Sequence, residues 1–265
     1  MSRISATFGT LRKNSRKALI PFITAGDPDQ ETTILLMHAL VSAGADIIEL
    51  GIPFSDPMAD GPVIQRSYER ALLHKINLDN VLEMVAEFRK ENIKTPVVLM
   101  GYANPIEAIG HQVFSEKAKE SGIDGVLVVD YPPEECGEWL ECLNQNNMDA
   151  IFLLSPTTPD RRILEIAKRA TGFIYYVSLK GVTGSAHLNL KEVENKLANL
   201  RSYFSIPIGV GFGIHDSETA KSISELADAV VIGSRLIREI EESSKEKIII
   251  NVSAFVRDLR VAIDR

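Results

Sequence analysis

Short apolar runs alternate along the chain with segments in which apolar residues recur every three or four positions. A short run rich in Val, Ile and Leu is typical of a strand covered on both faces, and the longer period is typical of an amphipathic helix. The predicted strands span 19–24, 46–50, 97–101, 125–129, 150–154, 173–177, 206–210 and 229–232. Eight strands alternating with helices predict an α/β fold, and they favour a closed (β/α)8 barrel over a doubly wound open sheet.

Helices are predicted between the strands, for example over 31–42, 78–90 and 133–144, with an Asn77 cap before the second and Pro in the first turns of the third. Residues 1–17 are predicted to form an extra N-terminal helix that closes the N-terminal end of the barrel, because Ile4, Phe8 and Leu11 share one side. Their Lys and Arg content, with no acid before Asp27, is also typical of an organellar transit peptide. We favour the helix.

Composition narrows the class of protein. The 265 residues carry a net charge of −7, which argues against a nucleic-acid-binding surface, so any bound anion is expected to be small. The two cysteines favour a reducing compartment, and no apolar run reaches the roughly 20 residues that span a bilayer. We expect one cytoplasmic domain over 1–265, since barrels of about this length form single units.

Two acids follow the second predicted strand. Glu49 shares a strand face with Ile47 and is expected to point into the barrel mouth, where aliphatic neighbours would raise its pKa toward a range useful for proton transfer. A salt bridge at the strand end is the alternative. Asp60 lies in a Pro- and Gly-rich loop, where it could also serve as a turn or cap residue. As a pair in unlike surroundings, the two acids fit separate acid and base roles.

Glycine-rich segments follow the last three predicted strands: Gly181 and Gly184 after the sixth, Gly211 and Gly213 after the seventh, and Gly233-Ser234 at the start of a helix after the eighth. Each alone is most often a tight turn. Together they match the phosphate site that recurs in barrels, where backbone N–H groups and a helix N-terminus face the anion.

The run ELGIPFSDPMADGPVIQ at 49–65 resembles the signature of tryptophan synthase alpha chains. Further segments of the same pattern extend the resemblance over nearly the whole chain: PFITAGDPD at 21–29, MGYANPI at 100–106, GVLVVDYPPEE at 125–135, SPTTPDRRI at 155–163, GVTG at 181–184 and GVGFGI at 209–214. The resemblance implies a lyase of tryptophan biosynthesis that cleaves indole-3-glycerol phosphate into indole and glyceraldehyde 3-phosphate.

The resemblance also implies roles for residues. Glu49 would be the general acid and base, Asp60 would stabilise the indole N–H, and Tyr175, which shares parity with Phe173 and Val177, would place its hydroxyl near both acids. Phosphate would be held by Gly184, Gly213 and Ser234, and Thr183 would close over Asp60 from a mobile lid at 178–190. Five further residues would form an apolar slot for the indole ring: Phe22, Met100, Leu127, Leu153 and Phe212.

A partner is implied as well. Members of the family dock on a pyridoxal-phosphate-bearing beta chain in an alpha2-beta2 complex, and indole passes between the chains, so no cofactor is expected in this chain. The expected docking residues are Pro53, Asp56, Pro57, Asn104 and Pro132, Glu134 and Glu135. Exposed Pro and Asp in loops are also common in simple turns.

Two rival functions remain open from the sequence. Lys180, near the end of the sixth strand, could form a Schiff base in a phospho-sugar aldolase, although its parity is opposite to that of Tyr175. The barrel could instead only activate a partner, but the presence of both acids favours catalysis. No metal is predicted, because the five histidines form no cluster with Cys or carboxylates.

Overall fold

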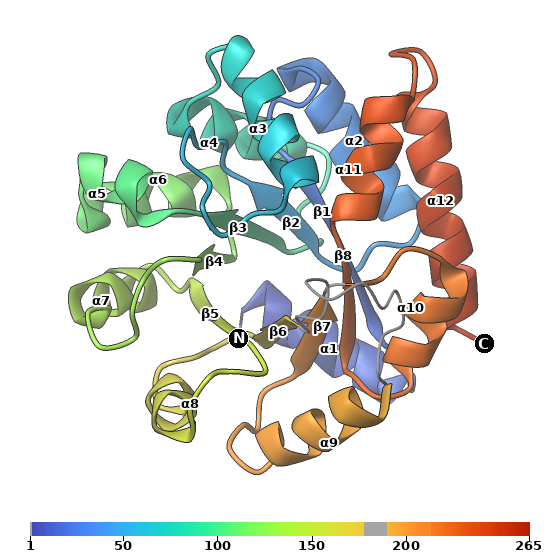
Figure 1. Cartoon of the computed structure of the whole chain (residues 1–265). Helices are drawn as coiled ribbons and strands as arrows, with labels where there is room; N and C mark the ends of the chain where they lie inside the picture. Colours follow the sequence, from blue (N-terminus) through green and yellow to red (C-terminus); the bar gives the residue numbers. More distant parts are fainter. Residues whose placement is uncertain (1, 178–189, 212) are drawn as a thin grey trace.

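Eight parallel strands close into a barrel in the computed structural model, which describes residues 2–177, 190–211 and 213–265 (Figure 1). The strands are β1 (Ala18–Thr24), β2 (Ile48–Gly51), β3 (Val97–Gly101), β4 (Gly125–Val128), β5 (Asp149–Leu154), β6 (Ile174–Val177), β7 (Ile208–Gly211) and β8 (Ala229–Ile232). Each pairs with its neighbour in sequence, and β8 returns to β1 with Ala18 opposite Ala229. The predicted closed barrel is therefore confirmed, and the open sheet is excluded.

Two predicted strands begin two residues too early, and the strand predicted to begin at 173 begins at Ile174. Asp46 lies outside β2, because its carboxylate accepts the Leu19 backbone N–H at 2.8 Å and pairs with Arg260 at 3.0 Å. β7 begins at Ile208, directly after Pro207, whose nitrogen carries no hydrogen for a strand ladder. These interactions move the starts of β2 and β7 by two residues and leave the strand order unchanged.

Helices cover the outside of the barrel (Figure 1). In the described part of the chain they are α1 (Arg3–Lys13), α2 (Gln30–Ser42), α3 (Pro62–Leu73), α4 (Leu78–Arg89), α5 (Ala103–Ile109), α6 (His111–Ser121), α7 (Gly137–Gln145), α8 (Asp160–Ala167), α9 (Leu190–Leu200), α10 (Ser217–Ser224), α11 (Ser234–Glu242) and α12 (Ile248–Ile263). Asn77 caps α4 as predicted, since its side chain accepts the Asn80 N–H.

The predicted start of α7 at residue 133 is wrong. The backbone N–H of Glu135 donates to the Pro132 carbonyl at 3.0 Å, so the two prolines form a turn, and the helix begins only at Gly137. Proline suits the second position of such a turn as well as it suits a helix start. Turn and helix start could not be distinguished from the sequence for this reason.

The N-terminal helix closes one end of the barrel. It spans Arg3–Lys13, shorter than the predicted 1–17, and stops before Ser15, whose φ of 54° is left-handed. Ile4, Phe8 and Leu11 are buried and belong to one cluster with inward-facing strand residues. The Phe8 ring lies 5.9 Å from that of Phe173 in the barrel interior. The prediction that this helix closes the N-terminal end of the barrel, as an N-terminal plug, is confirmed.

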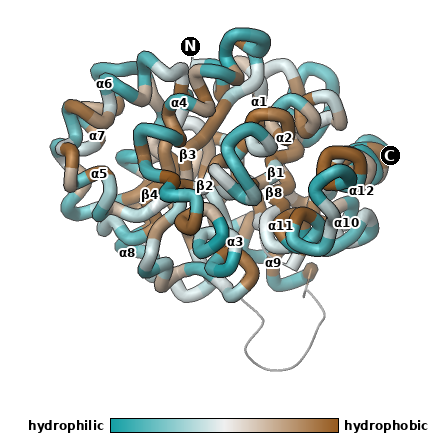
Figure 2. The backbone as a smooth tube through the Cα atoms, turned by 90° about the horizontal axis from the view of Figure 1, so that it is seen from above, coloured by the Kyte–Doolittle hydropathy of each residue, from teal (hydrophilic) through white to brown (hydrophobic). Residues whose placement is uncertain are grey.

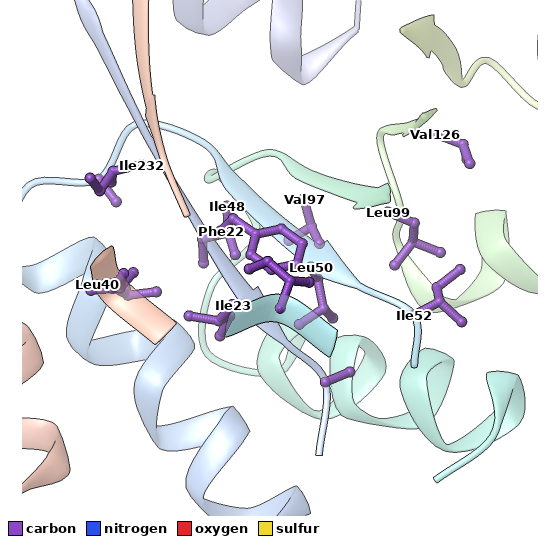
Figure 3. Packing of buried hydrophobic residues seen from close by; sticks show 14 of the residues in the cluster. Phe22, Ile23, Leu40, Ile48, Leu50, Ile52, Val97, Leu99, Val126 and Ile232 are labelled. Carbon is purple, nitrogen blue, oxygen red and sulfur yellow. The ribbon is translucent and has the colours of Figure 1, made fainter. Parts of the chain in front are cut away.

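Two apolar layers hold the barrel together. Outward-facing strand residues such as Ile48, Leu50 and Leu99 pack under the helices (Figure 3). Seen from above, hydrophobic segments follow the strands, whereas hydrophilic stretches occupy the outer helices (Figure 2). The inward-facing layer begins at the N-terminal plug and ends in four partly buried side chains: Met100, Val129, Leu153 and Tyr175. These four form part of the floor of a cavity at the other end. Among the described residues, no helix is long and apolar enough to cross a membrane.

Candidate active site

A cavity of about 380 Å³ opens at the C-terminal ends of the strands. It is lined by eight of the predicted site residues: Phe22, Glu49, Asp60, Met100, Leu153, Tyr175, Gly213 and Ser234. They come from segments that are far apart in sequence, and only barrel closure brings them to one cavity. This is the end of the fold where barrel enzymes carry their chemistry.

Glu49 is the central acid of the cavity. Alternation along β2 points it inward with Ile47, and it pairs in register with Phe22 of β1. Glu49 is 1 % exposed, and among the described residues neither of its carboxylate oxygens has a hydrogen-bond partner. Burial, with a smaller contribution from the charge of Asp60, raises the pKa of Glu49 from 4.5 to about 8. Such a group holds a proton at neutral pH and can release it slightly above, as a general acid and base must.

Asp60 lines the same cavity from the loop before α3, where Gly61 precedes the first helical residue, Pro62. Tyr102 donates its hydroxyl hydrogen to Asp60 Oδ2 at 2.6 Å, and the Ala59 N–H donates to the same hydroxyl oxygen at 3.1 Å. Burial raises the pKa of Asp60, and the Tyr102 hydrogen bond opposes that rise. The hydrogen bond therefore favours the carboxylate form and holds it in one orientation.

Tyr175, on β6, is the third polar residue of the site besides Glu49 and Asp60. It lines the same cavity, as predicted, and burial together with the charges of Glu49 and Asp60 holds its pKa far above the usual range. Its phenol therefore remains a neutral donor. Its ring fits because residue 211 is glycine: a Cβ there would lie 2.4 Å from the Tyr175 hydroxyl oxygen.

The opposite end of the cavity has the features of an anion site. Gly213 has a φ of 75°, which favours glycine, and α11 begins at Ser234 directly after Gly233. The first N–H groups of a helix have no partner within the helix, and its dipole favours a negative charge there. Gly184, Thr183, Phe212, Lys180 and the predicted lid up to residue 189 lie outside the described residues, and Leu190 belongs to α9.

One predicted slot residue does not line the cavity. Leu127 is fully buried in the interior layer, one step deeper along its strand than Val129, which takes the predicted place in the cavity wall. The resemblance pointed to Leu127, and the two residues have the same parity along the strand, but only Val129 lies at the depth of the cavity.

Several residues of the cavity wall were missed from the sequence. Val231 and Ile64 extend the apolar surface, and Arg235, Arg238 and His215 lie toward the anion end. The helical spacing of Ser234 and Arg238, four positions apart, was the available signal. Tyr102 was also missed, because its role depends on Asp60 from another loop. Over the residues that the structure describes, no group of three or more His, Cys, Asp and Glu is placed to hold a metal ion.

The predicted docking residues divide by exposure. Asp56, Asn104, Glu134 and Glu135 are exposed, Pro57 and Pro132 are half-buried, and Pro53 is buried. In the isolated chain Pro53 therefore shapes the loop and offers little surface. Phe54 of this loop stacks on Tyr102 with ring centroids 5.1 Å apart, which connects the loop to the group that holds Asp60.

Comparisons with known proteins agree over the full chain. The family model described as tryptophan synthase alpha chain matches residues 8–264. The tryptophan synthase alpha chain of Nitrosomonas europaea is 64% identical over 264 residues, with 100% of this chain and 96% of the relative covered. That of Nitrosospira multiformis is 62% identical, with 100% and 95% covered.

Solved structures give the same result. A tryptophan synthase alpha subunit from Legionella pneumophila superposes with a TM-score of 0.94 at 46% identity, covering 100% of this chain and 99% of the other. A Mycobacterium tuberculosis tryptophan synthase in an aminoacrylate-bound form superposes with a TM-score of 0.89 at 29% identity, covering 99% and 100%. The chain therefore belongs to the tryptophan synthase alpha chain family, partners of a beta chain, and is a lyase of tryptophan biosynthesis that cleaves indole-3-glycerol phosphate to indole and glyceraldehyde 3-phosphate.

Proposed function

We propose that Glu49 transfers both protons of this cleavage. The protonated carboxyl gives its proton to indole C3, which prepares the bond between C3 and the glycerol phosphate side chain to break. The carboxylate so formed takes the proton of the adjacent hydroxyl as the carbonyl forms, and Glu49 returns to its starting state. The observation that carries the proposal is a buried, unpartnered carboxyl in the cavity wall with a pKa of about 8.

Asp60 would act by charge. Once C3 is protonated, positive charge spreads onto the indole nitrogen, and a carboxylate that accepts the indole N–H stabilises it most strongly where water is excluded. The Tyr102 hydrogen bond supports this role, because it favours the ionised form of Asp60. Tyr175 would remain neutral and donate a hydrogen bond near the two acids. Phe22, Met100, Leu153 and the other predicted slot residues would enclose the indole ring.

The phosphate would lie at the far end, on backbone N–H groups of Gly213 and Ser234, with Gly184 and the lid residue Thr183 contributing from the segment after β6. Support comes from the left-handed φ of Gly213 and from the helix that begins at Ser234. The anchored phosphate would set the distance from the indole ring to Glu49, which fixes the reacting carbon within reach of the acid.

Release of indole from indole-3-glycerol phosphate by the purified chain tests the acid pair. We expect Glu49→Gln to lose nearly all turnover and Asp60→Asn to lose about a hundredfold or more, as an electrostatic stabiliser would. Glu120→Gln, which removes an exposed carboxylate on α6, is the matched control and should retain full activity. Substantial turnover by Glu49→Gln would refute the assignment of Glu49.

We further propose that the chain docks on a beta chain in an alpha2-beta2 complex through Asp56, Asn104, Glu134 and Glu135, with Pro57 and Pro132 at the rim. The pyridoxal phosphate would belong to the beta chain. Support comes from the exposure of these four side chains and from the Phe54–Tyr102 stack, which joins the loop of Asp56 to the segment before Asn104. Replacing Asp56 and Asn104 by Ala should weaken beta-chain binding in calorimetry, and unchanged binding would exclude this surface.

We also propose that the chain is located in the cytoplasm. The two cysteines, Cys136 and Cys142, are both buried and free, as expected of a protein in a reducing compartment. Fractionation of the cells that express the chain would test the location.

A further inference from the structure

Charges are unevenly distributed around the cavity. Glu49 and Asp60 line it from β2 and the loop before α3, whereas Arg235 and Arg238 line it from α11 and His215 from the segment after β7, with Gly213 and Ser234 as neighbours along the chain. A phosphate dianion that enters this cavity is repelled by the Asp60 carboxylate, and backbone N–H groups oppose that repulsion only with partial charges. A full positive charge beside the anion end would change this balance.

Arg238 is placed to supply that charge. It lies four residues after Ser234 on α11, so both residues share one face of the helix. Helical side chains lean toward the N-terminus of their helix, which directs the Arg238 guanidinium toward the turn that begins at Ser234. Accordingly Arg238 lines the cavity, although its backbone lies a full turn away from the helix start.

The neighbouring basic side chains already have partners. Arg235 Nη2 pairs with Glu239 at 2.8 Å, and its guanidinium carbon lies 4.9 Å from the Phe255 ring centroid, although its buried Nη1 has no hydrogen-bond partner among the described residues. His215 Nδ1 lies 2.9 Å from the Thr219 hydroxyl. Within the described residues, by contrast, Arg238 is exposed and no ion pair or hydrogen bond of its side chain is found. Its charge is available to a ligand.

We propose that Arg238 is a positioning residue that holds the substrate phosphate with its guanidinium, in addition to the backbone N–H groups. The proposal rests on the proposed phosphate end at Gly213 and Ser234. A guanidinium at the rim attracts the dianion during entry and donates hydrogen bonds to its oxygens once bound. Because it lines the cavity from α11, whereas Glu49 lines it from β2, we expect its effect to fall on substrate binding and to leave the proton-transfer step unchanged.

Binding measurements on a chain that cannot turn over provide the test. In the Glu49→Gln background, calorimetry would give the dissociation constants for indole-3-glycerol phosphate, inorganic phosphate and indole. We expect Arg238→Gln to weaken the first two about fivefold to tenfold, the effect of losing a partly screened charged hydrogen bond, and to leave indole binding unchanged. The weakening should shrink as salt is raised.

Two variants complete the design. Arg238→Lys keeps the charge and should recover most of the phosphate affinity, and Arg257→Gln removes an exposed arginine of α12 and should change nothing. Equal weakening of indole and phosphate would indicate a structural effect and overturn the proposal, as would unchanged phosphate binding in Arg238→Gln.

Gly213→Ala tests the role of Arg238 separately from the proposed phosphate end at Gly213 and Ser234. Alanine strains a backbone with a φ of 75°, so this variant perturbs the phosphate end itself. Loss of phosphate binding in Gly213→Ala with none in Arg238→Gln would overturn the role of Arg238 alone. Unchanged phosphate affinity in both variants would also overturn the proposal that Gly213 and Ser234 bind the phosphate.

Discussion

Replacing Glu49 by Gln should stabilise the chain increasingly as the pH rises. The folded chain holds the Glu49 proton up to a pH of about 8, whereas the unfolded chain releases it near 4.5. In this window the folded state binds more protons than the unfolded state, so the stability contributed by residue 49 falls as the pH increases. Glutamine cannot ionise, so the variant does not lose this stability as the pH increases.

The magnitude follows from the pKa. The rise from 4.5 to about 8 corresponds to about 5 kcal/mol when Glu49 is fully ionised, at about 1.4 kcal/mol per pKa unit. The penalty grows by about 1.4 kcal/mol per pH unit below pH 8 and levels off above it, which amounts to about 2 to 3 kcal/mol between pH 6 and pH 9. Other titrating groups are common to both chains and cancel in the difference.

Urea unfolding followed by circular dichroism at pH 6, 7, 8 and 9 would measure the difference in the free energy of unfolding between Glu49→Gln and the unmodified chain. We expect the variant to gain about 2 to 3 kcal/mol over this range, and we expect the exposed control Glu120→Gln to stay within about 0.5 kcal/mol of the unmodified chain throughout. A difference that stays constant with pH would refute the view that a desolvated, unpartnered carboxyl lies in the cavity.

Three further predictions concern the surroundings of the site. Tyr102→Phe removes the hydroxyl that donates to Asp60, so the pKa of Asp60 rises further and the acidic limb of the kcat/KM profile should move to higher pH; an unmoved limb would contradict this role. Arg70→Met removes the bidentate partner of the buried Asp27 carboxylate and should lower the free energy of unfolding by about 3 kcal/mol in urea, with a smaller loss when Asp27→Asn accompanies it. Leu127→Ala truncates a core residue and should lower the free energy of unfolding by about 2 to 5 kcal/mol, but it should leave the KM for indole-3-glycerol phosphate unchanged. A raised KM would show that Leu127 contacts the substrate.

Much of the fold could be predicted because its signals are local. Alternating apolar runs and helical periods depend on neighbouring residues, and they gave the strand count, the closing pair β8 and β1, and the N-terminal plug with Ile4, Phe8 and Leu11. Strand parity gave the inward direction of Glu49 and Tyr175. The boundaries of two elements were predicted wrongly, since Asp46 and Pro132 make hydrogen bonds that the pattern of apolar residues does not contain.

The remainder of the site depends on contacts between distant segments. Tyr102 donates to Asp60 across 42 positions of the chain, and Arg70 joins Asp27, 43 positions away, to Glu241 on α11. Neither pair has a spacing that a local pattern could reveal. Arg238 had such a spacing relative to Ser234, but only the shape of the cavity distinguishes it from an ordinary surface arginine.

The sequence by itself determined which side chains face inward, the closed barrel, and the two acids after the second strand, because periodicity and short motifs act over a few residues. Only the tertiary structure decided that Glu49 has no hydrogen-bond partner within the described part of the chain, that Tyr102 orients Asp60, and that Leu127 lies below the cavity floor. The physical reason is that desolvation and hydrogen bonding depend on every group that surrounds a side chain, and barrel closure brings those groups from all parts of the chain.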